Sequence, residues 1–165
     1  MRGLMLLISM LFMAVGTCTA DAQVAGIEVV DRGIYTIETG SETKDPNTPT
    51  GTITAVKDVK NVELTTTIPA RLGIEFGFQY IVVGEPAGAE VTLDIVNIYP
   101  EQGLPTPGST EHLFRSEYSR TKKIGEIEYL GYGFENAWEV VPGNWTFQIW
   151  YDGRQMMEQS FTVTE

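Results

Sequence analysis

The amino-acid sequence predicts an all-β domain folded as an antiparallel β-sandwich of seven to nine strands. After the first two dozen residues, helical periodicity is nearly absent, and short segments of alternating apolar and polar residues lie between Gly, Pro and Asp residues. Removing an N-terminal leader would leave 143 of the 165 residues, a length that suits one immunoglobulin-like sandwich. The candidate strands, some of which should merge or drop out, are 27–31, 33–38, 51–56, 59–66, 72–83, 91–99, 113–121, 126–134, 144–151 and 156–164.

The N-terminus has the three parts of a secretory signal peptide. Arg2 supplies a positive charge, residues 4–15 form an apolar run, and Ala20-Asp21-Ala22 offers a cleavage site between small residues. The apolar run of 12 residues is too short to cross a bilayer as a helix, and no later segment is long or apolar enough to do so. We therefore expect residues 1–22 to be a signal peptide and residues 23–165 to be a single β-sandwich domain, periplasmic or secreted.

The only cysteine, Cys18, lies in this leader, so cleavage after Ala22 would leave a domain held by its apolar core without a disulfide. Residues 15–18 faintly resemble a bacterial lipobox, although Thr17 stands where that motif has Gly, Ala or Ser. Lipid anchoring through Cys18 is therefore the alternative to ordinary cleavage.

The charge balance disfavours two classes of partner. The chain has 11 basic and 22 acidic residues, a net charge of −11, whereas a nucleic-acid-binding protein needs a basic surface. The same charge disfavours unassisted binding to anionic membranes. Four bases nevertheless gather within nine residues, either as a contact for an acidic partner or as part of an edge strand whose lysines discourage aggregation: Arg115, Arg120, Lys122 and Lys123.

Segment 72–83 shows how the alternation assigns faces. Every second side chain is apolar and is expected in the core: Leu72, Ile74, Phe76, Phe78, Tyr80 and Val82. The opposite face is mixed, and Gly73 and Gly77 on it leave room for a close neighbour, a bulge or a contact surface.

The C-terminal hairpin has the clearest pattern. Apolar residues alternate along both of its strands: Trp145, Phe147, Ile149 and Tyr151, then Met157, Phe161 and Val163. A two-residue turn at 152–153 would place Phe147 opposite Glu158, a register that wastes the core. We therefore expect a three-residue loop, 151–153, which places Phe147 opposite Met157.

The same register leaves Trp150 on the outer face, opposite Arg154. In one interpretation, Trp150 packs under its neighbours with Arg154 over its ring. In the other, Trp150 and Arg154 form a binding site in which the aromatic ring anchors a sugar or a partner protein. If Trp150 only packs, we expect the anchor in loops 39–50 or 100–110, or among Tyr129, Tyr132 and Trp138.

Most catalytic and cofactor chemistry lacks the residues that it needs. The lone His112 has no nucleophile motif, zinc would require more His or Cys ligands, and no nucleotide-binding Gly-rich loop is present, so we expect no cofactor. Carboxylates are plentiful, with Glu126 and Glu128 on one strand face and Glu135 and Glu139 flanking Trp138. A carboxylate pair of the glycosidase kind therefore stays open. Calcium would find oxygen ligands but no loop of the usual pattern.

Three stretches together resemble a known family: residues 33–35, residues 68–78 with Pro-Ala-Arg-Leu-Gly, and residues 141–145 with Val-Pro-Gly-Asn-Trp leading to residues 161–163. The chain resembles the bacterial domain-of-unknown-function family 3859. The resemblance implies a bacterial exported domain with an immunoglobulin-like sandwich, and it implies no activity and no functional residues.

Two function classes follow. The first is a non-catalytic binding or structural module of the cell envelope that recognises an unknown protein or glycan partner. The second is a small secreted hydrolase that uses carboxylates, such as a glycosidase. The absence of an assembled catalytic constellation favours the first, and convergence of acid pairs in a concave pocket would favour the second.

Overall fold

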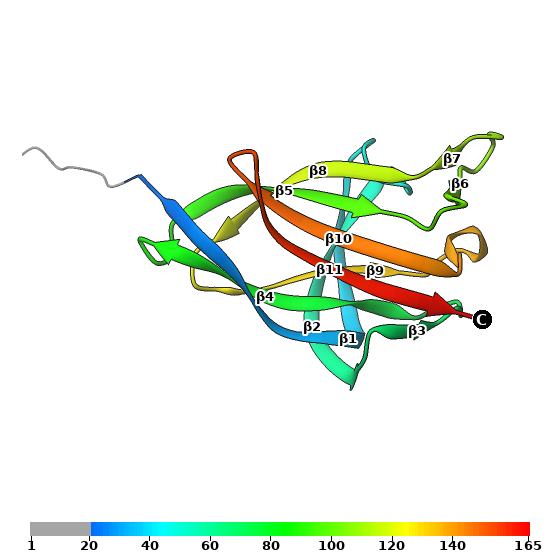
Figure 1. Ribbon diagram of the computed structural model, residues 1–165, viewed down its shortest axis with the longest axis horizontal. Coiled ribbons are helices and arrows are strands. Elements are labelled where there is room, and N and C mark those ends of the chain that lie inside the picture. Colours follow the sequence, from blue (N-terminus) through cyan, green and yellow to red (C-terminus); the bar gives the residue numbers. More distant parts are fainter. Residues whose placement is uncertain (1–20) are drawn as a thin grey trace, which may run out of the picture.

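The computed structural model describes residues 21–165, so Cys18 and all but the last two residues of the expected signal peptide lie outside the described range. The described chain is almost entirely strand (Figure 1). Its elements are β1 (Gln23–Lys44), β2 (Thr52–Leu64), β3 (Thr67–Pro69), β4 (Glu75–Glu85), β5 (Glu90–Ile98), β6 (Leu104–Pro105), β7 (His112–Leu113), β8 (Arg115–Lys123), β9 (Ile127–Gly133), the 3-10 helix η1 (Ala137–Glu139), β10 (Gly143–Tyr151) and β11 (Arg154–Thr164).

Two sheets pack face to face, which confirms the predicted all-β sandwich. The first sheet has the order β2-β1-β4-β9, the second has the order β3-β11-β10-β5-β8, and β6 and β7 form a small separate ribbon. Neighbouring strands are antiparallel except for β3, which runs parallel to β11. The edge strands β9 and β8 of the two sheets face each other without a hydrogen-bonded ladder between them, and we call the side of the sandwich between them the open side.

The core lies where the alternation places it. Phe76, Phe78, Tyr80 and Val82 of β4 are all buried, as is Ile74 just before the strand. Leu72 is the exception, at 56% exposure, because the chain turns at residues 71–74 before β4 begins, with Gly73 in the left-handed conformation.

Trp145 of β10 is the centre of an aromatic cluster that joins the two sheets. Its ring contacts those of Phe76, Tyr99, Tyr132 and Phe134, with centroid distances of 4.9 to 5.7 Å. Its indole Nε1 donates to the carbonyl oxygen of Val141 at 2.9 Å, so the polar atom of this buried side chain is satisfied.

The expected three-residue loop in the C-terminal hairpin is wrong. Tyr151 pairs with Arg154 across the two-residue turn Asp152-Gly153, in which both residues have positive φ, as a type I′ turn requires. One extra residue in β11, between the pairs Trp150–Gln155 and Ile149–Met157, restores the phase of the core. The sequence-based argument missed this bulge, so it rejected the correct turn.

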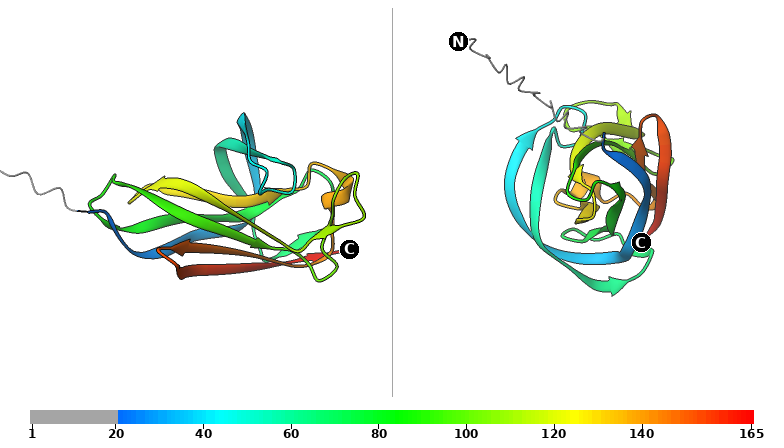
Figure 2. Two further views of the ribbon diagram at one scale, coloured as in Figure 1. Left: turned by 90° about the horizontal axis from the view of Figure 1, so that it is seen from above. Right: turned by 90° about the vertical axis from the view of Figure 1, so that its left-hand side faces the viewer.

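A long two-stranded arm leaves the first sheet. β1 pairs with β4 as far as Tyr35–Glu75, and then continues with β2 alone to the pair Lys44–Thr52 (Figure 2). We call residues 37–57 the arm. Residues 39–44 were expected in a loop, but they extend β1. Every side chain of this segment is exposed, so it has no apolar alternation to mark it as a strand.

The basic segment lies on β8, the edge strand of the second sheet. Lys122 Nζ reaches Glu128 Oε2 of β9 at 2.6 Å across the open side, and Arg115 and Lys123 each pair with a nearby glutamate. The edge position agrees with the edge-strand interpretation. Three of the four bases also form ion pairs within the chain.

Candidate functional site

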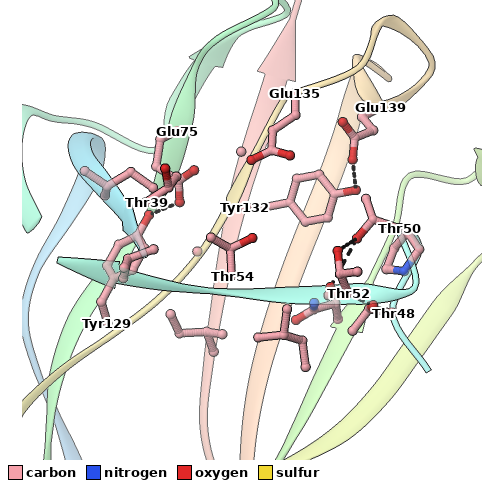
Figure 3. A pocket seen from close by; sticks show the side chains of 18 of the residues that line it. Thr39, Thr48, Thr50, Thr52, Thr54, Glu75, Tyr129, Tyr132, Glu135 and Glu139 are labelled. Carbon is pink, nitrogen blue, oxygen red and sulfur yellow. Dashed lines mark hydrogen bonds between the residues drawn. The ribbon is translucent and has the colours of Figure 1, made fainter. Parts of the chain in front are cut away.

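A cavity of about 190 Å³ lies between the arm and the open side of the sandwich. We call it the arm cavity. Its walls come from β4, β5, β8, β9 and the turn into η1, and the arm covers it (Figure 3). Threonines line the arm, and tyrosines and glutamates line the opposite wall. The lining residues used below are Thr48, Thr50, Thr52, Thr54, Glu75, Asn97, Tyr118, Arg120, Tyr129, Tyr132, Glu135 and Glu139.

Two further hollows extend the arm cavity along the arm. One lies under the tip of the arm, against Leu104 and Trp138, and shares residues 48–50 with the arm cavity. The other lies toward Lys122 and Glu128, and shares Tyr129, Arg120 and three residues of β2 with the arm cavity. The three hollows therefore adjoin one another along the arm, and together we call them the groove beneath the arm.

Glycines on the outer face of β4 and β9 make room for a Glu75–Tyr129 pair. Tyr129 Oη donates to Glu75 Oε1 at 2.7 Å. A Cβ on Gly131 would overlap the hydroxyl of Tyr129, and a Cβ on Gly133 would overlap the carboxylate of Glu75. Both polar side chains thus lie flat along the sheet because their neighbours have no side chain.

Burial sets the protonation of this pair. It raises the pKa of Glu75 to about 7; the hydrogen bond from Tyr129 opposes the rise, and the negative charge of Glu135 adds to it. Burial also raises the pKa of Tyr129 well above its usual range, and Glu75 adds to that rise. Tyr129 therefore remains a proton donor, while Glu75 exchanges its proton near neutral pH.

Glu139 is committed to structure. It is 1% exposed, and its Oε1 accepts from Tyr132 Oη at 2.9 Å. Its Oε2 accepts from the backbone N and the side-chain Nδ2 of Asn136 at 2.6 and 3.1 Å, which caps η1. With both oxygens occupied, Glu139 shapes the wall and fixes Tyr132.

Asn97 is the one lining side chain with a buried polar atom that lacks a partner among the described residues. It lies on the inner face of β5 at 4% exposure, and its Nδ2 donates to Tyr118 Oη at 3.5 Å. Its Oδ1 accepts no hydrogen bond within residues 21–165. A buried carbonyl oxygen without a donor costs about 1–3 kcal/mol, so this wall is unsatisfied as it stands.

The arm holds its shape through bonds of its own. Thr48 Oγ1 lies 2.9 Å from the carbonyl oxygens of both Asp45 and Thr52 and donates its single proton to these acceptors, and Thr50 Oγ1 donates to the carbonyl oxygen of Thr52 at 3.1 Å. All described hydrogen bonds of the arm lie within the β1–β2 hairpin. The cover of the cavity is therefore joined to the opposite wall by contacts other than hydrogen bonds.

Trp150 lies on the outer face of the second sheet, away from the arm cavity. It is half-buried, and its Nε1 donates to Gln148 Oε1 at 2.9 Å. Its partner in the ladder is Gln155, whereas Arg154 pairs with Tyr151. The expected Trp150–Arg154 pair is therefore wrong as a register, and the binding role of these two residues stays a prediction.

Sequence-based reasoning found part of this wall. It named Tyr129, Tyr132, Glu135 and Glu139 as isolated candidates, and the structure brings them together. It missed Glu75 and Asn97. The glycines opposite Glu75 were the available signal, whereas Asn97 gave none within an apolar strand.

Convergence of acid pairs in a pocket was expected to distinguish a carboxylate hydrolase from a binding module. This condition is partly met, since three carboxyl groups line one cavity. Glu126 lies in the turn before β9, and Glu128 pairs with Lys122, so these two do not form an acid pair at the cavity. No group of three or more His, Cys, Asp or Glu residues in the described range could hold a metal ion.

The family model described as Domain of unknown function (DUF3859) matches residues 23–163. An immunoglobulin-like protein from Pseudomonas aeruginosa has a similar structure, with a TM-score of 0.59 and 24% identity over 89% of this chain and 99% of that chain. An alkylpurine DNA glycosylase from Pseudomonas fluorescens, bound to DNA containing an abasic site analog, reaches a TM-score of 0.36 and 16% identity over 61% of this chain and 28% of that chain. The second likeness is too weak to carry an argument, and the first supports the fold.

No curated protein has a matching sequence. Among residues 21–165, no helix has the length and apolar character needed to cross a membrane.

Proposed function

The chain belongs to the DUF3859 family, and we propose that it is an exported, non-catalytic binding module of the bacterial cell envelope whose ligand, a protein segment or a glycan, is held beneath the arm. The tripartite N-terminus supports export. The groove beneath the arm supports binding.

The observation that carries the proposal is a covered cavity whose wall contains an unsatisfied polar group. A purely structural domain would gain stability by filling this space with apolar side chains. This chain instead leaves Asn97 Oδ1 without a donor. It covers the space with an arm whose hydrogen bonds stay within its own hairpin. Such a cover can admit a ligand without breaking hydrogen bonds to the wall.

The side chains around the cavity favour binding over catalysis. Glu139 has both oxygens occupied by hydrogen bonds within the fold. His112, the only histidine, is exposed on β7 and outside the lining of the arm cavity. The lining of the arm cavity thus contains no histidine and no cysteine to act as a base or nucleophile.

Site-specific cross-linking tests the binding module. A photoreactive residue placed at Thr54, on the arm, should capture a protein or glycan from the periplasm or culture medium. The same residue at Thr162, exposed on β11, should not. In the protein that carries the photoreactive residue at Thr54, Thr52→Trp, which fills the cavity from the same strand, should abolish capture, with Thr162→Trp as the matched control. Equal capture at both positions would place the ligand elsewhere.

A carboxylate hydrolase is the second candidate, because three carboxyl groups line one cavity and Glu75 has a pKa of about 7. A carboxylic acid that is protonated near neutral pH can act as a general acid on a glycosidic oxygen, with Glu135 as the second carboxylate. Turnover of glycoside or polysaccharide substrates that disappears in both Glu75→Gln and Glu135→Gln would replace the binding proposal with this one.

A further inference from the structure

The edge of β9 that borders the arm cavity carries main-chain groups directed away from the sheet. Just beyond β9, the amide of Phe134 donates to the carbonyl oxygen of Ile74 at 2.9 Å, so these two residues form a hydrogen-bonded pair that continues the β4–β9 register. Hydrogen-bonded and non-hydrogen-bonded pairs alternate along an antiparallel ladder, and this register has no shift. The even-numbered residues of β9 therefore bond to β4, whereas Tyr129 and Gly131 direct their N–H and C=O groups toward the open side.

These free main-chain groups lie in the lining of the arm cavity, to which Tyr129 and Gly131 both belong. Among residues 21–165, no described hydrogen bond outside the ladders involves the main-chain N–H or C=O of either residue. The two residues are separated by about 7 Å along the strand, which is the repeat at which one strand bonds to the next. An unpaired edge of this kind is a template for an additional strand.

The two strand edges at the open side are protected differently. β8 carries four basic residues, and Arg120 Nη1 donates to the main-chain carbonyl oxygen of Ser119 at 3.2 Å. β9 has the sequence Ile-Glu-Tyr-Leu-Gly-Tyr-Gly, without the Lys or Pro residues that discourage pairing at an edge. The arm lies over β9, but it runs across this strand rather than alongside it (Figure 3) and forms no ladder with it. The edge of β9 is thus covered but not paired.

The groove beneath the arm follows β9 along its length. The hollow toward Lys122 reaches Ile127, the arm cavity extends over residues 129–135, and the hollow under the tip of the arm continues to Trp138. β9 has seven residues and therefore spans about 20 Å. A groove that is elongated along a strand edge fits an extended chain better than a compact ligand.

The charge of the groove changes along its length. Three bases and two acids line the end near Ile127: Lys57, Arg120, Lys122, Asp58 and Glu128. Toward the other end, Glu135 is exposed and takes part in none of the ion pairs found among residues 21–165. An extended segment with an acidic residue toward Ile127 and a basic residue toward Glu135 complements both ends.

We infer that an extended segment of a partner polypeptide adds a strand to the free edge of β9, beneath the arm. The inference rests on the proposed function and specifies the ligand as a polypeptide rather than a glycan. A polypeptide main chain repeats one donor and one acceptor at the spacing of the edge, which a glycan does not. Side chains of the added strand alternate between the arm, where Ile37, Ile53 and Val56 line the cavity, and the space between the sheets, which Tyr118 lines.

Peptide selection followed by amide hydrogen exchange tests the inference. The probe is the most enriched sequence from a phage-displayed library of random peptides as long as β9. In NMR measurements, the amides of Tyr129 and Gly131 should exchange about ten-fold or more slowly when this peptide is bound than in the free protein. The amides of Leu130 and Tyr132, which donate to β4, should be protected in both states and are the internal control.

Main-chain methylation of the peptide separates strand addition from recognition of side chains. Two versions of the enriched peptide carry N-methyl groups on alternate amides, in the two possible phases. Because an added strand directs every second amide toward β9, one version should bind about ten-fold or more weakly than the other. Equal binding of the two versions would overturn strand addition.

The outcomes separate this inference from the proposed function. If no peptide is enriched, or if the enriched peptide leaves the exchange of Tyr129 and Gly131 unchanged, strand addition is wrong, and cross-linking from Thr54 then decides the proposed function independently. Capture of a glycan at Thr54, without slower exchange at β9, would keep the binding module and overturn the polypeptide ligand. A Tyr129 amide that is as protected as that of Leu130 in the free protein would show that the edge is already paired, which also contradicts the inference.

Discussion

Replacing Glu75 with glutamine should remove the loss of stability that ionisation of this one carboxyl causes as the pH rises. The pKa of this carboxyl is raised from 4.5 to about 7 by burial, so the folded state holds a proton that the unfolded chain has lost. Its contribution is favourable below pH 4.5 and is lost as the pH rises through 7. Between pH 5 and 8 this one group should cost the wild type up to ~2.5 kcal/mol, and Glu75→Gln should not show that loss.

Glutamine keeps the side-chain length and an acceptor for Tyr129, so the comparison isolates the ionisation. Urea denaturation of both proteins at several pH values gives the difference in unfolding free energy directly. At a slope of ~1–3 kcal/mol per molar, the midpoint of the variant should rise relative to the wild type by about 1 M or more by pH 8. Glu101→Gln serves as the control for loss of a surface charge. A difference between Glu75→Gln and the wild type that changes by less than ~0.5 kcal/mol across this range would refute the buried, proton-holding carboxyl.

Three further predictions test the core, the sheet surface and the N-terminus. Trp145→Ala should lower the unfolding free energy by ~3–5 kcal/mol, because the indole fills the aromatic cluster between the sheets. Trp150→Ala should lower it by about 1–2 kcal/mol, because that ring is half-buried on the outer face. Equal losses in urea denaturation would contradict this placement. Gly131→Ala should lower the unfolding free energy by about 1–3 kcal/mol, since the new Cβ meets a tyrosine hydroxyl and a backbone carbonyl oxygen. Gly133→Ala should lower it by less than about 1 kcal/mol, because only the end of a flexible glutamate must move. Thermal melts that rank the two variants in the opposite order would show that the wall is not packed as described. The intact mass of the exported protein should correspond to a chain that begins at Gln23, whereas a lipid-modified start at the cysteine would establish the anchored form.

The sequence predicted the sandwich because a strand that is buried on one face has apolar residues at every second position. Phe76 on β4 and Trp145 on β10 are buried where that period places them. The same reasoning failed in the C-terminal hairpin, because one bulged residue in β11 shifts the period without any change in composition. It also failed for residues 39–44, where neither face of the strand is buried in the core.

The candidate site was recognisable only in fragments. Tyr129, Glu135 and Glu139 lie close together along the chain, and their residue types marked them as candidates. Their cover comes from residues 37–57, and the unsatisfied carbonyl oxygen comes from Asn97. The cavity therefore depends on the long-range pairing of β1 with β4 and of β5 with β8. The alternation of apolar and polar residues assigns each side chain to one face of its strand, but it does not predict which strands, distant in sequence, lie next to each other around the cavity.

The placement of the first and last strands has a mechanical consequence. β1 begins at Gln23 at one end of the sandwich, and β11 ends at Thr164 near the other (Figure 1). A pull that separates these ends acts along both strands, at right angles to the hydrogen bonds of the β1–β4 and β10–β11 ladders. The bonds of each ladder then carry the load in shear and must yield together rather than unzip one at a time. Resistance to such tension is governed by the rate of forced unfolding, so a domain tethered at one end and loaded at the other could hold without high equilibrium stability.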